Sequence, residues 1–505
     1  MNLPWLGSIP APANAKASRI ALASILLLAL TARLWVVATQ TYIAYPDETF
    51  QYLEPAHRLA FGSGVVTWEY LDGIRSWLLP GVIAGVMRAV AAFDSTPQAY
   101  LLVLRLLCVG ASLAVPYAGY RLGSRCAGLG GGVAAGLLCA LSPQALYFAP
   151  VAMTEPLAAY ATLLAIVLGA DAAGRPRRLV LAGILFGLAC ALRYQYAPVI
   201  AAVAVWQHVR DRRAFISVAI GGAAVVVAVL GGLDWATWGA PFQSVWLNYL
   251  RNGPQGISQA IGEQSWPFYL AYFVAGWGAA TPVLLICLCI GAWRSSVLAG
   301  LVVVTLALHS VVPHKELRFI FIAMAVVPML IGIGLVSIVN LLPRRWAAPR
   351  VQVGLALALA AVIGIGTETR TRGPSDWHRD RSLLWATAAA RDIPEACGLV
   401  IRSAKVYRTG GYSYWHRDVP IYFETWDLAH EIPGSSLRLR KDNIMNRKSR
   451  PQYPAAELPA HAEKFNVMIG MPADILPGYA VRTCFGEDRP DDLAYCVFTR
   501  PGGCG

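Results

Sequence analysis

A series of long apolar runs, separated by short polar turns, constrains the fold of this chain more than any other feature of its sequence. About eleven runs are long enough to cross roughly 30 Å of hydrocarbon as helices. They lie near residues 19–38, 99–120, 127–147, 152–170, 179–193, 195–209, 215–233, 267–291, 297–312, 319–340 and 351–367. Of the 505 residues, 56% are hydrophobic and only 14% are charged, which excludes an ordinary soluble protein. The sequence therefore predicts a polytopic α-helical membrane protein.

The basic residues predict which loops face the cytoplasm. They form small clusters between the apolar runs: Lys16/Arg19, Arg121/Arg125, Arg175/Arg177/Arg178, Arg210/Arg212/Arg213, Arg294 and Arg344/Arg345/Arg350. These clusters share one side of the membrane only if a further apolar run, residues 77–93, lies along the interface as an amphipathic or re-entrant element. We therefore expect eleven spans, a cytoplasmic N-terminus and a C-terminal tail on the far side. Arg33, in the first span, is expected to snorkel toward the helix end.

The same clusters bear on possible partners of the chain. A net charge of +13 is compatible in principle with nucleic-acid binding. Because most Lys and Arg residues sit between apolar runs, where they orient helices in anionic membranes, the basicity is assigned to topology. The predicted partners are therefore the lipid bilayer and membrane-borne substrates, with no nucleic acid.

A change in composition near residue 374 divides the chain into two predicted domains. Residues 1–373 form the transmembrane part, with a first outer loop at 39–98, and residues 374–505 form a small soluble α/β domain. In the tail we expect a helix at 376–393, strands at 398–402 and 465–470, a hairpin of 481–484 with 495–500, and a mobile loop at 433–457.

Four cysteines in the tail, Cys397, Cys484, Cys496 and Cys504, allow three disulfide pairings. Cys484 and Cys496 flank a turn-rich run, which favours these two as a hairpin staple. Such bonds require that the tail lies in an oxidising compartment.

The first outer loop carries paired carboxylates, Asp47 and Glu48, directly after Pro46. Ionisable groups at the edge of the hydrocarbon are costly and mark reaction or transport paths. A carboxylate there can take the proton of an acceptor hydroxyl, and Asp47 is favoured for this role. The alternative is that the acids cap a following helix at 49–61. For Glu48, a catalytic role and a capping role both stay open. Further along the loop, Trp68, Glu69 and Arg75 are candidate substrate-binding residues, although Trp also populates any membrane interface.

Two helical positions in the same loop, Glu54 and His57, lie three residues apart and are assigned a structural role.

A second group of candidates supplies positive charge. His314, Lys315 and Arg318 lie within one short turn, and Arg193 follows an earlier span. A departing lipid phosphate needs such cations, and Arg can hold phosphate with two hydrogen bonds. The alternative is interfacial snorkelling with a local pair between Lys315 and Glu316.

Two further residues are weaker candidates for substrate binding. Glu155 begins a span, where it can instead cap the helix, and Asn248 flanks a glycine-rich outer loop. The sequence contains no Walker pattern, no glycine-rich phosphate loop after a strand and no His-rich metal spacing, so we predict no cofactor and no metal.

The motifs Pro46-Asp47-Glu48-x-x-Gln51-x-x-Glu54-x-x-His57, Phe61-Gly62-x-Gly64, Thr67-Trp68-Glu69, Ile74-Arg75-Ser76 and His314-Lys315-Glu316-x-Arg318-Phe319 together resemble glycosyltransferase family 22. These are lipid-phosphate-mannose-dependent mannosyltransferases of the N-glycan and glycolipid-anchor pathways. The resemblance covers the membrane part and not the tail. It implies a GT-C fold, an inverting reaction, a polyprenyl-phosphate-linked mannose donor and Asp47 as the base.

The chain departs from the family pattern at two positions, which bear on acceptor identity. Tyr45 stands where the family commonly has His, and Leu317 stands where it usually has a second acid. The absence of Asn-x-Ser/Thr acceptors, with abundant Ala and Gly, favours a bacterial inner-membrane enzyme that faces the periplasm.

The predicted function is therefore an inverting hexosyltransferase acting on a lipid-linked or envelope glycan acceptor. A lipid-linked sugar flippase and a ligase that transfers whole glycans are the alternatives.

Overall fold

The computed structural model describes residues 15–172, 175–208, 211–343, 345, 347–371, 377, 380–404, 408–424, 452–453, 455–486 and 493–504. The chain folds into two compact units. Unit 1 comprises Met1–Ala38, Arg105–Phe242 and Gly262–Ser375. Unit 2 comprises Thr39–Leu104, Gln243–Ile261 and Asp376–Gly505. The C-terminal tail thus belongs to the same unit as the first outer loop.

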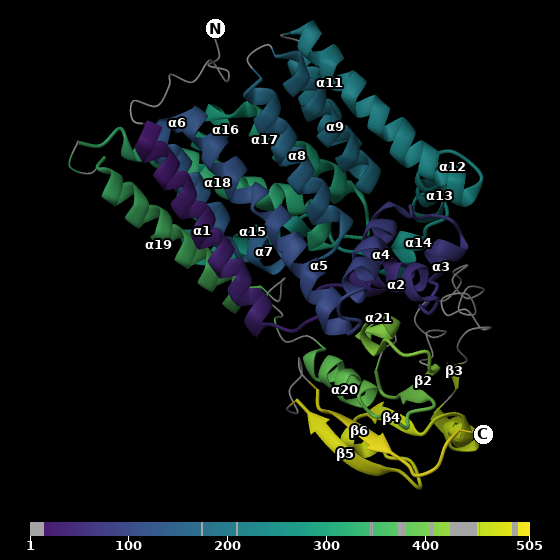
Figure 1. Ribbon diagram of the computed structural model, residues 1–505. Helices are drawn as coiled ribbons and strands as arrows, with labels where there is room; N and C mark the ends of the chain where they lie inside the picture. Colours follow the sequence, from purple (N-terminus) through teal and green to yellow (C-terminus); the bar gives the residue numbers. More distant parts are fainter. Residues whose placement is uncertain are drawn as a thin grey trace. The chain divides into compact units, whose positions relative to one another are not determined.

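Unit 1 is built from apolar helices (Figure 1). They are α1 (Ala15–Thr39), α6 (Ala114–Leu141), α7 (Pro143–Tyr147), α8 (Thr154–Ala170), α9 (Pro176–Leu192), α10 (Ala197–His208), α11 (Arg212–Val225), α12 (Gly232–Trp238), α15 (Phe268–Trp277), α16 (Thr281–Arg294), α17 (Ser296–Val311), α18 (Phe321–Val339) and α19 (Pro349–Arg370). Helix α5 (Pro97–Ser112) begins in unit 2 and ends in unit 1. Every predicted apolar run coincides with helix. In the described part of the chain, six helical stretches are long and apolar enough to cross a membrane, and shorter apolar helices accompany them.

The longest helical stretch, Pro97–Leu141, contains a hairpin. Its backbone breaks at Gly128, which has a φ of +69° that favours glycine. A Cβ atom on Gly123 would lie 2.5 Å from the Gly131 carbonyl oxygen, so the two halves approach each other through backbone. Small residues permit this kind of close helix packing in membranes. The hairpin explains why the sequence shows two apolar runs here and places a basic cluster at the bend.

Helix α18 forms the centre of unit 1. Of the most apolar 18 residues in the stretch Leu317–Val339, 94% are buried. Its Gly332 packs against the backbone of Ala135 in α6, and its Gly334 packs against the backbone of Cys287 in α16. A helix that is apolar on all sides must be covered by other helices, and α18 meets this condition.

Arg33 corrects one expectation from the sequence. Its side chain does not snorkel but is fully buried in unit 1. Nε donates a hydrogen bond to Ser112 Oγ at 2.9 Å, and Nη1 donates to the Ala140 carbonyl oxygen at 3.1 Å. Because α1 continues past Arg33 to Thr39, neighbouring helices surround the guanidinium and supply its acceptors.

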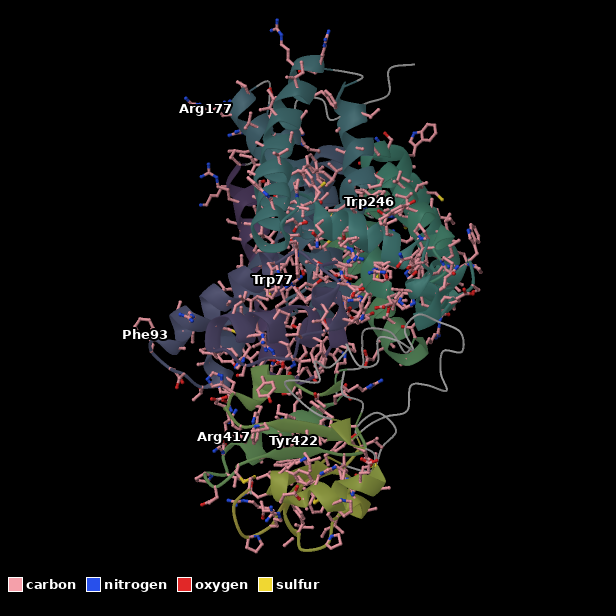
Figure 2. All side chains as sticks on the ribbon, turned by 90° about the vertical axis from the view of Figure 1, so that its right-hand side faces the viewer. Trp77, Phe93, Arg177, Trp246, Arg417 and Tyr422 are labelled. Carbon is pink, nitrogen blue, oxygen red and sulfur yellow. A yellow bond between two sulfur atoms is a disulfide. The ribbon has the colours of Figure 1, made fainter. Side chains whose placement is uncertain are left out.

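The outer-loop part of unit 2 consists of short helices. They are the π-helix η1 (Glu48–Leu53), α2 (Glu54–Phe61), α3 (Trp68–Leu71), α4 (Leu78–Ala91), α13 (Gln243–Asn252) and α14 (Ile257–Ile261). Helix α4 has 14 residues and a length of about 21 Å, too short to cross the hydrocarbon. Phe93, just after α4, is 95% exposed and lies at the outer edge of the ribbon (Figure 2).

The tail forms a six-stranded sheet in the order β3-β2-β1-β4-β6-β5. Its strands are β1 (Leu399–Ile401), β2 (Ile421–Glu424), β3 (Gln452–Tyr453), β4 (Val467–Gly470), β5 (Ala480–Phe485) and β6 (Tyr495–Thr499). Strands β3, β2, β1 and β4 are parallel, whereas β6 pairs antiparallel with β4 and β5. The sequence predicted β1, β4 and the β5–β6 hairpin but not β2 and β3. The predicted loop at 433–457 lies largely outside the described residues.

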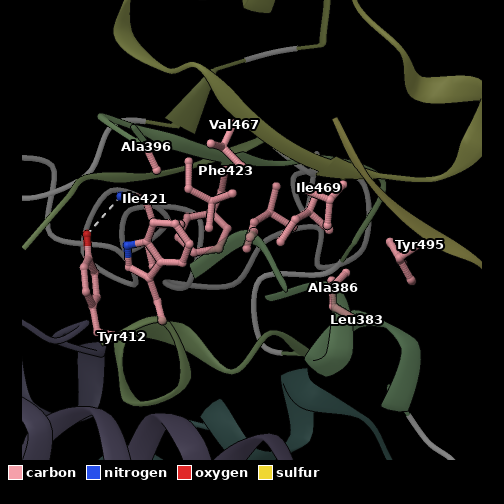
Figure 3. Packing of buried hydrophobic residues seen from close by; sticks show 14 of the residues in the cluster. Leu383, Ala386, Ala396, Tyr412, Ile421, Phe423, Val467, Ile469 and Tyr495 are labelled. Atoms are coloured by element: carbon pink, nitrogen blue, oxygen red, sulfur yellow. Dashed lines mark hydrogen bonds between the residues drawn. The ribbon is translucent and has the colours of Figure 1, made fainter. Parts of the chain in front are cut away.

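Both faces of the sheet are covered, in keeping with an α/β domain. Leu399 and Ile401 face one cluster, with residues of α20 (Arg381–Arg391) and α21 (Gly411–Trp415), while Val400 between them faces the other. Figure 3 shows the first cluster, in which the Tyr412 hydroxyl accepts a hydrogen bond from the Ile421 N–H at 3.0 Å.

The first cluster also contains two outer-loop residues. Phe50 of η1 and Val65 pack among the tail residues of this core and are almost fully buried. The tail and the first outer loop therefore share one hydrophobic core within unit 2.

Two disulfides cross-link the tail. Cys484 and Cys496 are direct partners across β5 and β6, as the sequence favoured. Cys397 and Cys504 join the start of β1 to the end of the described chain, at a sequence separation of 107 residues. The remaining described cysteines are free, and they lie in or beside apolar helices.

Candidate active site

The first carboxylate of the outer loop, Asp47, is held by an amide. Asp47 precedes η1 but makes no side-chain capping bond to its backbone. Its Oδ1 instead accepts a hydrogen bond from Gln51 Nε2, and the same nitrogen donates to Glu69 Oε1 at 3.0 Å. Gln51 therefore bridges two carboxylates. The capping alternative for Asp47 finds no support in this geometry.

The local fold explains how these side chains meet. Gln51 follows Asp47 by four residues and so lies on the same face of the helical turn. Glu69 comes from α3, and the next residue, Tyr70, donates from its hydroxyl to the Gln51 carbonyl oxygen at 2.7 Å. This second bond ties α3 to η1 and fixes the distance between the two acids.

The two acids have different environments. Glu69 is buried, and burial raises its pKa, while the nearby Arg75 guanidinium opposes the rise and the Asp47 charge adds to it. Asp47 is less buried than Glu69. The pair thus places a partly exposed acid beside a carboxyl group that resists ionisation.

Other predicted residues of this loop are partly accessible. Glu48 lies in the first turn of η1 and is half-buried, as are Trp68 and Arg75. Asn248 of α13 is buried and donates from Nδ2 to the Ile74 carbonyl oxygen at 3.3 Å. Asn248 therefore holds the backbone of the Trp68–Arg75 loop in the structure.

Unit 1 contains the predicted cations, which meet at the ends of three helical elements. Arg193 follows α9, Glu155 lies in the first turn of α8, and Arg318 lies in η5 (Leu317–Ile320). Arg193 Nη1 is 2.8 Å from Glu155 Oε1, and Arg318 Nη1 is 3.5 Å from the same oxygen. All three side chains are buried. Glu155 thus joins two guanidinium groups.

A second acid completes this network. Arg318 Nε donates to Glu316 Oε2 at 2.7 Å, and Glu316 Oε1 lies 2.9 Å from His314 Nε2. Burial alone would raise the pKa of Glu316, but the Arg318 guanidinium and the bond from His314 lower it. The same bond raises the pKa of His314. Glu316 is therefore ionised, and it favours the protonated form of His314.

Lys315 does not form the pair with Glu316 that was the alternative to phosphate binding. Its ammonium donates to the carbonyl oxygens of Val312 at 2.7 Å and Gln264 at 3.0 Å, with Pro313 at 3.5 Å. These contacts use the donors of the ammonium group and close the turn before η5. The carboxylate of Glu316 pairs with Arg318 and His314, not with Lys315.

An aromatic ring orders the two guanidinium groups. The Cζ atoms of Arg193 and Arg318 lie 5.1 Å and 5.2 Å from the centroid of the Phe319 ring. A cation over an aromatic face is attracted to it, and a planar guanidinium also stacks there. Two ordered guanidinium groups of this kind are suited to an anion such as phosphate.

Two contributions were missed by reasoning from the sequence. Gln51 was part of a quoted motif without a role, although its spacing of four residues from Asp47 was a visible signal. Glu316 was considered only as a partner of Lys315. Among the described residues, no group of three or more His, Cys, Asp or Glu side chains has the geometry to hold a metal ion.

Comparison with known proteins gives a family match over most of the membrane part. Residues 24–371 match the Alg9-like mannosyltransferase family. GPI mannosyltransferase 3 of Trypanosoma brucei brucei is 27% identical over 355 residues, covering 57% of this chain and 61% of that protein. The Yarrowia lipolytica protein of the same name is 28% identical over 299 residues, covering 56% of each. The match thus spans little more than half the length of these relatives.

Solved structures share the fold at low sequence identity. ArnT from Cupriavidus metallidurans, bound to undecaprenyl phosphate, has a TM-score of 0.60 at 11% identity, covering 96% of this chain and 98% of that one. The arabinofuranosyltransferase AftD from Mycobacteria has a TM-score of 0.51 at 14% identity, covering 98% of this chain and 40% of that one. At these identities the likeness establishes the GT-C fold alone.

Proposed function

The chain belongs to the Alg9-like mannosyltransferase family, glycosyltransferase family 22, and from this membership we propose that it is an inverting mannosyltransferase. The proposed donor is mannose linked to a polyprenyl phosphate, and the acceptor is a lipid-linked or envelope glycan. Relatives named as GPI mannosyltransferases support the sugar, and the undecaprenyl phosphate in the ArnT structure supports a lipid phosphate carrier.

The proposed base is Asp47. Its carboxylate takes the proton of the acceptor hydroxyl while that oxygen forms a bond to the anomeric carbon of mannose. The bond between this carbon and the phosphate oxygen breaks with inversion, and the electron pair leaves with the polyprenyl phosphate. The half-buried carboxylate of Asp47, ordered by Gln51, supports this role. Glu48, Trp68, Glu69 and Arg75 are proposed to line the substrate site around it.

The departing phosphate is assigned to the cations of unit 1. Arg193 and Arg318 stabilise the negative charge that grows on the phosphate oxygen. Glu155 and Phe319 hold the two guanidinium groups in place beforehand, so little reorganisation is needed during the reaction. His314, whose protonated form is favoured by Glu316, is proposed to contribute a further donor. In unit 1, Lys315 is proposed to hold the turn before η5, and in unit 2, Asn248 is proposed to hold the Trp68–Arg75 loop. No step in this mechanism requires a metal ion.

We place the reaction on the periplasmic face of a bacterial inner membrane. Two disulfides in the tail favour an oxidising compartment for unit 2. The basic clusters between apolar helices favour the opposite side for the inner loops. Alkylation of a cysteine introduced into the tail, with an impermeant reagent and intact spheroplasts, tests this orientation.

The family match over residues 24–371 is the observation that carries the proposal. Purified protein in lipid vesicles, given polyprenyl-phosphate mannose and glycolipid acceptors, is expected to form a new mannosidic bond. Asp47→Asn is expected to lower the rate by a factor of about 10² to 10⁴, because general-base catalysis contributes this much. Asp94→Asn, an exposed change in the same unit, is the matched control.

Other outcomes would replace the proposal. A correctly folded Asp47→Asn variant with normal transfer would remove Asp47 as the base. Sugar that only changes leaflet, with no new bond, would establish a flippase, and transfer of a whole glycan would establish a ligase. Loss of activity with a chelator, restored by a divalent ion, would contradict a metal-free mechanism.

A further inference from the structure

Gln51 combines two ordered hydrogen bonds with one unused acceptor. Its side chain is 6% exposed. The amide nitrogen donates to Asp47 and to Glu69, so both of its N–H bonds are used. The amide oxygen, Oε1, is buried and has no hydrogen-bond partner among the described residues. A buried acceptor without a partner is uncommon in folded proteins and calls for an explanation.

The orientation of this amide follows from its neighbours. Rotating the group by half a turn would place Oε1 against two carboxylate oxygens, where no donor is available unless an acid is protonated. Asp47, as the proposed base, offers no donor, so the amide nitrogen must face it, and the same nitrogen lies 3.0 Å from Glu69 Oε1. The unused oxygen consequently points away from both acids, and it lies on the same small planar group that binds the Asp47 carboxylate.

We propose that Gln51 positions the base and recognises the acceptor sugar: its N–H groups hold the Asp47 carboxylate beside Glu69, and its Oε1 accepts a hydrogen bond from a second acceptor hydroxyl. This inference rests on the proposed function. A sugar with two neighbouring hydroxyl groups presents one to the carboxylate of Asp47 and the other to the amide oxygen. The acceptor class is therefore a glycan whose attacking hydroxyl has a hydroxyl neighbour.

The charged groups around Gln51 determine how the loss of its hydrogen bonds to Asp47 and Glu69 would affect these two acids. Burial raises the pKa of Glu69, Arg75 opposes this rise and Asp47 adds to it, while the charge of Glu69 adds to the raised pKa of Tyr70. Glu48 adds a further carboxylate next to Asp47 in the chain. A hydrogen bond donated to a carboxylate favours its ionised form. Removing the amide of Gln51 should therefore raise the pKa of Asp47 and shift its ionisation to higher pH.

The first experiment measures this shift without turnover. Difference infrared spectroscopy of the full-length protein in vesicles follows the carboxyl bands as pH changes, with Asp47→Asn identifying the band of Asp47. Gln51→Met, which keeps the length of the side chain but removes its donors, is expected to move that titration upward by about one pH unit. Gln98→Met, at an exposed position of the same unit, should leave it unmoved. An unmoved titration in Gln51→Met would overturn the positioning role.

The second experiment tests recognition of the hydroxyl. The acceptor is offered intact and as a series of monodeoxy analogues, each lacking one hydroxyl. Gln51→Met is expected to lower kcat/KM at least tenfold on the intact acceptor. One analogue, lacking the recognised hydroxyl, should be as poor with the unaltered protein as with the variant. Equal loss on every acceptor would overturn the recognition role.

A third variant separates a folding defect from either role. Gln51→Glu restores an oxygen acceptor but supplies no N–H group while ionised, so it should shift the Asp47 titration and keep part of the discrimination among analogues. If this variant and Gln51→Met both lose discrimination and shift nothing, the side chain is only structural. If the unaltered protein transfers no mannose while the infrared shift is present, the proposed function fails and the positioning of Asp47 stands.

Discussion

Glu54 offers the sharpest test of how the tail holds the outer loop within unit 2. Its side chain is fully buried. Oε2 accepts a hydrogen bond from the Val65 N–H at 2.8 Å, and Oε1 accepts one from the Ser413 N–H at 2.7 Å. One carboxylate thus joins the outer loop to the tail, close to the core that contains Phe50.

The size of the effect follows from these two bonds. Glu54→Gln keeps the shape but replaces one acceptor oxygen by a donor, so one of the two backbone N–H groups loses its partner. A hydrogen bond to a charged group contributes about 1.5–3 kcal/mol. Since 1.36 kcal/mol corresponds to a factor of ten, the N–H group that loses its partner, of Val65 or of Ser413, should exchange with solvent about 10- to 150-fold faster.

Hydrogen exchange with mass spectrometry on the protein in vesicles measures this change by segment. The acceleration should be largest in the peptide containing Val65 or Ser413 and smaller in the central strands. Glu457→Gln, an exposed change in the same unit, is the control and should alter exchange by less than a factor of about three. Unchanged exchange in Glu54→Gln would refute the reasoning.

An independent variant approaches the same contact from the other side. Gly411 has a φ of +57°, and a Cβ atom there would lie 2.5 Å from the Glu54 carboxyl carbon. Gly411→Ala should therefore displace the carboxylate and accelerate exchange in the same two segments. Normal exchange in this variant would show that the contact is not required.

Three further predictions concern other parts of the molecule. Glu316→Gln should raise the donor KM about tenfold in steady-state kinetics, because Arg318 loses the nearer of its two charged partners; an unchanged KM would contradict this. Replacing Cys397 and Cys504 by serine should lower the free energy of unfolding of unit 2 by about 2–4 kcal/mol, measured by denaturation of both forms without reductant. Burial lowers the pKa of His57 from 6.5 to about 4, so its unfolded form binds more protons between these values and stability falls as pH drops. From pH 7 to 5 this loss is about 2 kcal/mol, and His57→Phe should flatten the pH profile of unfolding.

The sequence predicted the architecture well because the relevant signals are local. Long apolar runs give membrane helices regardless of what surrounds them, and the break at Gly128 separates two runs that were already distinct. Strands β1 and β4 and the β5–β6 hairpin were visible as short apolar segments. Strand β2 was not, since its few residues form a strand only through pairing with β1.

The candidate site was predicted in part. Short motifs indicated the acids of the outer loop and the cations near Arg318, because these residue types are costly at a membrane surface. Their partners were not visible. The sequence predicted Lys315 as a phosphate-binding cation, with a pair to Glu316 as the alternative; in the structure backbone carbonyls accept from its ammonium, and Glu316 pairs with Arg318.

The sequence by itself therefore determined the membrane character, the family and the types of side chain that carry the chemistry. Tertiary structure alone decided the partner of each charge: the amide of Gln51 between two acids, the carboxylate of Glu54 on the N–H of Ser413, and the buried guanidinium of Arg33. The physical reason is that a buried polar group must find a partner wherever the chain happens to pass, and that path is set by the packing of distant segments.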